Sequence, residues 1–239
     1  MNIQILFYEF ISEGTIILDT FDYIEIVLWI ISIIIMFIIG FVFLSYSRRE
    51  PINKNFVYIG IFFFWFIASR ICRLIAKFVI GYEYGFFEFE GTLLMLAIGY
   101  TITSYIGVFF IYFFLERTIL KKTHYLFSTL VIVVTFLSIL NYAYPIIMVI
   151  LTPLYIGVLL ALPGVFLNLA RKTSGSVRKN ALIVAFGIIL FVLGVAFDIP
   201  EAASIWMNVP GLQSITKFAS PSLQIVGTLL MWKGFPRDV

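Results

Sequence analysis

Charged residues are scarce in this chain of 239 residues. Asp, Glu, Lys and Arg make up 12% of it, whereas soluble domains contain about 25%. Apolar residues make up 62%, against about 45–50% in soluble domains. So few charges cannot cover a water-exposed surface, which excludes a soluble globular domain. We therefore expect most of the chain to lie in lipid, as a multi-pass protein of the cell membrane.

Cysteine and histidine are almost absent, and this excludes several kinds of site. Cys72 is the only cysteine, so the chain has no intrachain disulfide framework and no cysteine-rich metal site. His124 is the only histidine, which excludes histidine clusters. We expect neither a metal nor a cofactor. The net charge of +3 does not indicate nucleic acid, because positive residues in a membrane protein usually mark its cytoplasmic side.

Long apolar runs are what the chain has in abundance. Runs of about 17 to 25 residues can each cross the hydrocarbon as a helix, which satisfies its own backbone hydrogen bonds. The sequence predicts an all-α bundle of seven transmembrane helices within residues 23–239. Residues 1–22 form a preceding tail, either an interfacial helix or a loosely ordered segment. The predicted spans are 23–46, 55–80, 91–115, 125–142, 145–169, 180–197 and 214–232.

The charges between these runs alternate in sign. The tail and the second and sixth connections are acidic, with Glu9, Glu13, Asp19, Asp22, Glu25, Glu83, Glu88, Glu90, Asp198 and Glu201. The first, third and fifth connections and the C-terminus are basic, with Arg48, Arg49, Lys54, Arg117, Lys121, Lys122, Arg171, Lys172, Arg178, Lys179, Lys233 and Arg237. Positive residues accumulate on the cytoplasmic side. The pattern predicts an N-terminus outside the cell and a C-terminus in the cytoplasm.

Three basic residues interrupt the second apolar run. Arg70, Arg73 and Lys77 are spaced i, i+3 and i+7, which places them on one face of a helix. Charges inside a membrane span usually face the bundle interior and mark a functional site. Lys77 is predicted to lie near the outer interface, where its amine can extend to the headgroups. Arg73 is predicted to lie within reach of carboxylates at the outer ends of other spans, which are Glu25, Glu90, Asp198 and Glu201.

Arg70 is predicted to lie near the membrane midplane, where neutral polar groups surround it. The third run carries Tyr100, Thr103 and Ser104 on one face, at about the depth of Arg70. Two interpretations remain open: a network that holds the helices together, or a pocket that admits an anionic ligand. Small and hydroxyl residues also suit close helix packing. The candidate ligand-binding residues are Arg70, Arg73, Tyr100, Thr103, Ser104 and Asp198.

Signatures of known membrane enzymes and receptors are missing. A rhomboid protease requires a GxSG serine, an intramembrane aspartyl protease two buried aspartates, and a ceramidase-like hydrolase several histidines. A retinal protein requires a lysine well inside the last helix, but Lys217 and Lys233 lie at its two ends. A PQ pair, typical of one family of sugar transporters, is also absent. We therefore do not expect an enzyme.

Two phrases in the sequence carry a resemblance. FIASRICRLIAKF at 66–78 and FFLERTILKKTHYLFS at 113–128 resemble uncharacterised seven-helix membrane proteins found in archaea. The layout of those proteins is similar to the seven-helix sensor regions that precede histidine kinases. The resemblance implies a stand-alone sensor-like module and no catalytic residue.

Taken together, the patterns favour a sensor or receptor-like module. Its ligand would bind in an outward-facing polar cavity between the second, third, sixth and seventh spans. Its ligand would be small or lipid-like, with an anionic group, and its partner a separate cytoplasmic or membrane protein. Membrane lipids are the other expected partners. A small-solute transporter or permeability pathway and a structural or assembly protein are the alternatives. The inner halves of the spans have few polar residues, which favours binding over transport.

Overall fold

The computed structural model describes residues 20–49, 54–79, 91–198 and 212–235. These residues form seven α-helices, with short 3-10 and π segments and no strand in the described ranges. The predicted all-α fold is therefore confirmed for this part of the chain. The helices are α2 (Thr20–Arg49), α3 (Phe56–Leu74), α4 (Gly91–Thr118), α5 (Leu126–Asn141), α6 (Met148–Lys172), α7 (Gly175–Asp198) and α9 (Leu212–Gly234).

Helix boundaries follow the predicted apolar runs closely. Helix α2 begins at Thr20, three residues before the predicted run, so Phe21 and Asp22 belong to the helix rather than to the preceding tail. Helix α3 continues beyond Leu74 as a π-helix, Ile75–Val79. Proline chemistry sets another boundary, because Pro145 opens a 3-10 turn, Pro145–Ile147, between α5 and α6. Residues 1–19, for which the sequence suggested an interfacial helix or a loosely ordered tail, lie outside the described residues.

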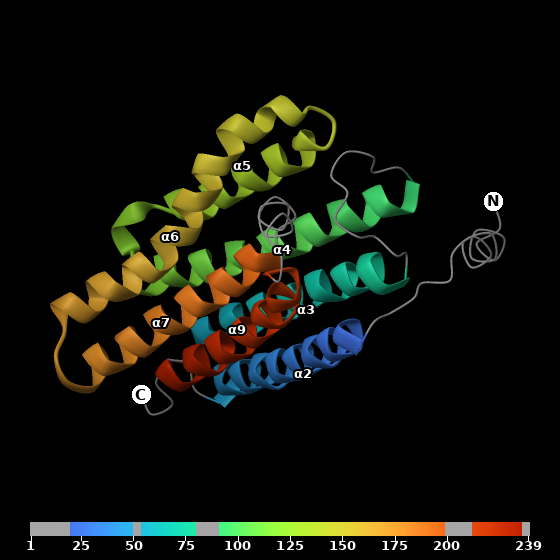
Figure 1. Cartoon of the computed structure of the whole chain (residues 1–239). Coiled ribbons are helices and arrows are strands. Elements are labelled where there is room, and N and C mark those ends of the chain that lie inside the picture. Colours follow the sequence, from blue (N-terminus) through green and yellow to red (C-terminus); the bar gives the residue numbers. More distant parts are fainter. Residues whose placement is uncertain (1–19, 50–53, 80–90, 199–211, 236–239) are drawn as a thin grey trace.

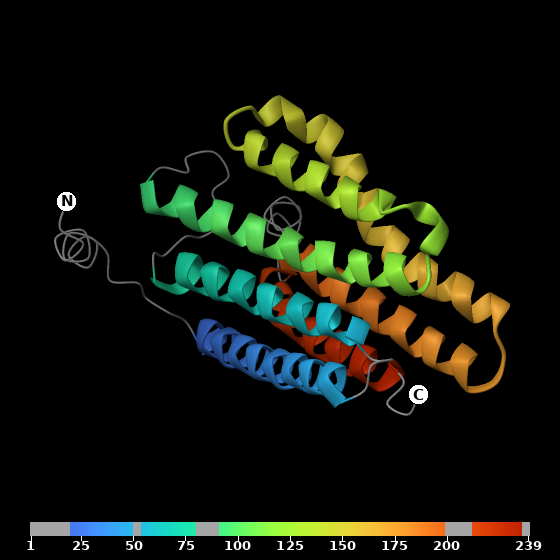
Figure 2. The same ribbon diagram turned by 180° about the vertical axis from the view of Figure 1, so that it is seen from behind.

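The helices alternate in direction and form a closed ring (Figures 1 and 2). Each helix packs against the next one in the chain, and α9 returns to pack against α2. Helix α5 lies at the edge of the bundle, between α4 and α6. At one end of the bundle, which we call the basic end, the described basic side chains are all exposed: Arg48, Lys54, Arg117, Lys121, Lys122, Arg171, Lys172, Arg178, Lys179 and Lys233.

Five of the described helices are long and apolar enough to cross a membrane: α2, α3, α4, α6 and α7. Helix α5 is apolar but has only 16 residues. Large apolar side chains on the outer face of α2, such as Ile34, Phe37 and Phe41, are more than half exposed. An apolar outer surface of this kind suits lipid rather than water. The helices therefore indicate a membrane-embedded protein.

Glycines bring α7 and α9 close together. In an antiparallel register, Gly187 lies opposite Gly227, and a Cβ added to Gly227 would lie 2.6 Å from the carbonyl oxygen of Gly187. One heptad further along α7, a Cβ at Gly194 would lie 2.8 Å from the carbonyl oxygen of Ser220. Small residues at such spacing allow helix backbones to approach within a membrane. This contact is the tightest helix pair in the ring.

Phenylalanine side chains fill the interior near the basic end. Phe235 follows α9, and its ring contacts the rings of Phe43, Phe56, Phe114 and Phe166 at centroid distances of 5.5–6.3 Å. Phe63 stacks on Phe43 at 6.2 Å. We call these six residues the phenylalanine cluster. It joins α2, α3, α4, α6 and the end of α9.

Candidate functional site

Charged side chains gather inside the bundle at the end opposite the basic end. They come from α2, from α3 with its π-helical extension, and from α9. All are buried or nearly so, and they lie at the other end of the interior from the phenylalanine cluster. We call this group the charged cluster, and it consists of Asp22, Glu25, Arg70, Arg73, Lys77 and Lys217.

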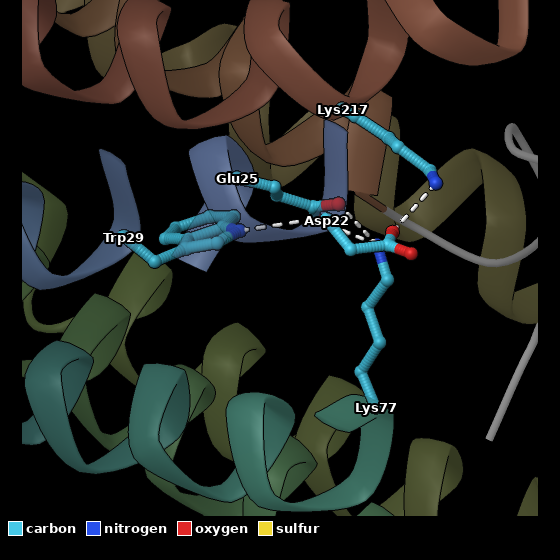
Figure 3. Close-up of polar contacts among 5 residues, drawn as sticks. All are labelled: Asp22, Glu25, Trp29, Lys77 and Lys217. Atoms are coloured by element: carbon cyan, nitrogen blue, oxygen red, sulfur yellow. Dashed lines mark hydrogen bonds and ion pairs between the residues drawn. The ribbon is translucent and has the colours of Figure 1, made fainter. Parts of the chain in front are cut away.

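Glu25 and Lys77 form a buried ion pair between α2 and the π-helix (Figure 3). Both carboxylate oxygens of Glu25 accept from the Lys77 amine at 2.6 Å. The Trp29 indole donates to the same carboxylate at 3.3 Å. Lys77 is only 8% exposed, so the expectation that its amine extends to the headgroups is wrong. The pair keeps a carboxylate and an amine compensated where water is excluded, and an extended lysine would leave Glu25 without this partner.

A second ion pair joins α2 to α9. The Lys217 amine lies 2.6 Å from the Asp22 carboxylate, and the two side chains are 13% and 11% exposed (Figure 3). Sequence reasoning assigned Asp22 to the tail and placed Lys217 only at the end of the last span, so it missed this pair. A signal was present, because Asp22 and Glu25 are spaced i, i+3 and share a helix face.

Arg70 is 1% exposed and lies among aromatic rings from three helices. The Cζ atom of its guanidinium is 4.6 Å from the ring centroid of Phe66, 5.1 Å from Trp29 and 5.7 Å from Tyr100. The negative face of an aromatic ring attracts a cation, more strongly where water is excluded. Tyr100 thus contacts Arg70 from α4, at the depth that the sequence suggested.

The other two predicted residues of α4 have different contacts. The Thr103 hydroxyl donates to the carbonyl oxygen of Gly99 in its own helix, at 2.7 Å. Ser104 shares a hydrogen bond of 2.6 Å with Ser69 of α3. Gly107, on the same face, packs closely against the backbone of Phe62. The hydroxyl and small residues of this face therefore serve helix packing, as in other membrane bundles.

Arg73 is also buried, on the interior face of α3. The structure describes the carboxylate of only one of the four predicted partners of Arg73. Glu25 forms the ion pair with Lys77, and Asp198 is the last residue of α7. The Asp198 side chain, Glu90 and Glu201 lie outside the described residues. Pairing of Arg73 with these acids stays a prediction.

Aromatic rings fill the interior next to Arg70, where sequence reasoning placed an outward-facing cavity. Phe191 of α7 lies 4.8 Å from Phe66 and 6.0 Å from Phe62, centroid to centroid. Phe66 in turn lies against Arg70. Rings of α3 and α7 are therefore in contact with each other beside Arg70.

At the basic end, the buried Glu116 holds the α4–α5 corner together. Its carboxylate accepts from the backbone amides of Phe127 and Ser128, at 2.8 and 3.1 Å, and from the Ser128 hydroxyl. A carboxylate at the first turn of a helix satisfies amides that have no partner within that helix. Both carboxylate oxygens of Glu116 therefore accept hydrogen bonds that stabilise the fold.

In the part of the chain that the structure describes, acidic, histidine and cysteine side chains do not gather at a common point. Among the described residues, no group of three or more such side chains is placed to hold a metal ion. Comparison of the chain with protein-family models, with curated proteins and with solved structures found no match.

Proposed function

We propose that the chain is a seven-helix membrane protein, with its N-terminus outside and its C-terminus in the cytoplasm, that acts as a receptor-like sensor module. A small or lipid-like ligand with an anionic group enters from the outer side and reaches Arg70. The bound state passes to a separate cytoplasmic or membrane partner. The observation that carries this proposal is the contrast between the two ends of the interior, the charged cluster and the phenylalanine cluster.

The phenylalanine cluster argues against a transport pathway. A path for a polar solute needs polar lining on both sides of the midplane. Near the basic end, the rings of five helical elements meet in stacked and face-to-edge contacts, and Phe43, Phe63 and Phe235 are at least nine-tenths buried. The basic end corresponds to the cytoplasmic side under the proposed orientation. An interior closed there supports binding over passage.

Arg70 is suited to an anionic group because the aromatic rings hold its guanidinium in place. Guanidinium nitrogens form charge-assisted hydrogen bonds with carboxylates and phosphates. Phe66, Trp29 and Tyr100 fix the position of Arg70 through contacts from three helices. A ligand that contacts this group touches α2, α3 and α4 together. Movement of these helices reaches the basic end, where Arg48, Lys54 and Arg117 are exposed to an acidic partner or to anionic lipid.

Trp29 provides a built-in probe for the binding test, because its ring lies against Arg70. The protein, with its other three tryptophans replaced by phenylalanine, is placed in phosphatidylcholine nanodiscs and titrated with dodecyl phosphate or with uncharged dodecanol. We expect only the phosphate to shift Trp29 emission and to raise the thermal midpoint, since a ligand that binds the folded state stabilises it. Arg70→Gln should abolish both effects, whereas Arg178→Gln, at an exposed position of the basic end, should retain them. An equal response to dodecanol would sink the proposal.

A bracing role is the second candidate, and the two ion pairs and the Ser69–Ser104 bond favour it. If Arg70 only holds helices together, Arg70→Gln should lower thermal stability in detergent, because charge-assisted contacts are lost. If Arg70 is kept for a ligand, the variant should be equally stable or more stable, since function commonly costs stability. The resemblance to sensor regions agrees with the second outcome.

A further inference from the structure

Three buried polar side chains on α2 and α9 have atoms without a hydrogen-bond partner. They are Ser32, Gln224 and Thr228, each with 0% of its surface exposed. The atoms concerned are the Ser32 and Thr228 hydroxyl oxygens and the Gln224 carbonyl oxygen Oε1. We call these residues the polar layer. An unsatisfied polar group costs more inside a membrane than elsewhere, because no bulk water is available to it.

The three residues lie within about one helical turn of one another along the bundle axis. Helices α2 and α9 run in parallel, in a register set by the Asp22–Lys217 ion pair at one end and by the Phe43–Phe235 contact at the other. Ser32 is ten residues beyond Asp22, and Thr228 is eleven residues beyond Lys217. Counted from this ion pair, the two hydroxyls differ by roughly one residue. Counted back from Phe43 and Phe235, Ser32 and Gln224 are each eleven residues away, so at ~1.5 Å per residue the three residues lie within about one helical turn.

They also face the same way. Along α9, Lys217, Gln224, Thr228 and Phe235 are spaced by 7, 4 and 7 residues, which keeps them on one face. Lys217 and Phe235, the first and last of this series, both contact α2. On α2, Ser32 lies between the buried Trp29 and Met36. The polar layer therefore faces the bundle interior beside the seam where α9 closes the ring onto α2. Gln224 also borders α7, because a Cβ added to Gly194 would lie 2.8 Å from its Cγ atom.

Other helical hydroxyls in the described residues behave differently. Those of Thr103, Thr118, Thr129, Thr135 and Ser138 donate to the carbonyl oxygen one turn earlier, at 2.7–2.9 Å. This local bond is the ordinary way for a hydroxyl to be satisfied inside a helix. Ser32 and Thr228 do not make it, so their hydroxyls are available to an additional group.

The chemistry of the layer restricts what that group is. The Gln224 amide Nε2 donates to the Ser220 hydroxyl at 3.3 Å, and the Ser220 hydroxyl donates to the Gly194 carbonyl oxygen at 2.7 Å. These bonds orient the Gln224 amide and leave Oε1 as an acceptor that requires a donor, which excludes an anion. A cation is disfavoured because Trp29, in the same layer, lies against the Arg70 guanidinium.

We infer that the polar layer of Ser32, Gln224 and Thr228 binds a neutral hydroxyl group, which donates to Gln224 and exchanges hydrogen bonds with the two hydroxyls. The group is an internal water molecule or the hydroxyl of a membrane-soluble alcohol. It forms a removable bridge across the α2–α9 seam, whereas α9 is held permanently to α7 by backbone contact at the glycines. The inference stands apart from the proposed ligand site, since it needs no anion at Arg70.

The first experiment compares thermal midpoints of the full-length protein in nanodiscs, using Thr228→Val, Ser32→Ala and the double variant. With a bridging group, each single variant should melt about 2–4 °C lower. The double variant should lose less than the sum, because both changes remove the same bridge. Thr135→Val, which loses only a bond within α5, calibrates the scale. A higher midpoint for Thr228→Val would overturn the inference, because it is the result expected for a layer without an occupant.

A second experiment identifies the occupant. In water-edited solid-state NMR, magnetisation from water should reach the Thr228 methyl group of the native protein and not that of Ser32→Ala/Gln224→Met. If it does not, added 1-octanol should raise the thermal midpoint of the native protein and leave that of Thr228→Val unchanged. The inference would be overturned if neither the transfer from water nor the 1-octanol effect on the thermal midpoint is observed. Arg70→Gln should leave both readings intact, so a failed anion response at Arg70 bears only on the proposed function.

Discussion

The two ends of the interior are built on different principles. In the charged cluster, side chains of opposite charge form ion pairs: Glu25 with Lys77, and Asp22 with Lys217. In the phenylalanine cluster, Phe235 contacts four other rings, and no single neighbour defines its environment. The first end is held together by specific pairs, and the second by shared packing.

This difference bears on where the molecule can respond to a ligand. Removing one member of a buried ion pair leaves an uncompensated charge, whereas a ring in a packed cluster has several partners that remain. The charged end is therefore the more sensitive to a single added or removed charge. The proposed receptor function needs this sensitivity to charge at one end only.

Labelling of introduced cysteines gives the largest expected effect, because it is all or none. In a Cys72→Ser background, a cysteine at Ser174 should be shielded from an impermeant reagent applied to intact cells, and one at Gly85 should react. The alternating charges place the first in the cytoplasm and the second outside. The reverse pattern would exchange the assignments of the two ends.

Glu25→Gln should be the most destabilising substitution. It leaves the Lys77 amine buried without its carboxylate, and breaking a buried pair costs about 3–5 kcal/mol. Unfolding in mixed micelles measures the loss. The double variant Glu25→Gln/Lys77→Met should recover much of it, since neither member of the pair is then left as an unmatched buried charge. A cost equal to that of Arg48→Gln, at an exposed position, would show that the pair is irrelevant to stability.

Phe235→Ala should have a smaller effect, about 1–3 kcal/mol. A buried phenylalanine in a soluble core costs ~3–5 kcal/mol to truncate, but lipid is as apolar as the core, so mainly packing is lost here. Phe235→Leu should restore most of the stability in the same assay. If Phe235→Ala cost more than Glu25→Gln, the contrast between the two ends would be reversed.

Asp22→Asn should cost the least stability of the three substitutions, about 1 kcal/mol. The Asp22–Lys217 pair lies closer to the surface than the Glu25–Lys77 pair, with side chains 11–13% exposed against 4–7%. Lys217 then reaches solvent or headgroups at a lower cost, as flexible lysines do near helix ends. Added salt should reduce the difference from the native protein. Insensitivity to salt would indicate that this pair is as enclosed as the deeper one.

Sequence reasoning located the helices and part of the charged cluster. It placed Arg70, Arg73 and Lys77 on one helix face, and Arg70 beside Tyr100, because helical spacing and depth can be counted along the chain. It expected hydroxyl neighbours for Arg70 and did not foresee Trp29 and Phe66 around its guanidinium. It also missed Gln224 and Thr228, because polar residues within a mostly apolar run do not reveal which way they face.

The positions and approximate ends of the helices were determined by the sequence alone, because a helix in lipid satisfies its backbone hydrogen bonds locally and apolar length decides where it lies. Only the tertiary structure decided which side chains meet. Lys77 pairs with a residue 52 positions away, and Lys217 with one 195 positions away. Such pairs depend on which helices become neighbours and on how each is rotated, and these are set by the packing of the whole ring, including the glycine contact that holds α9 against α7.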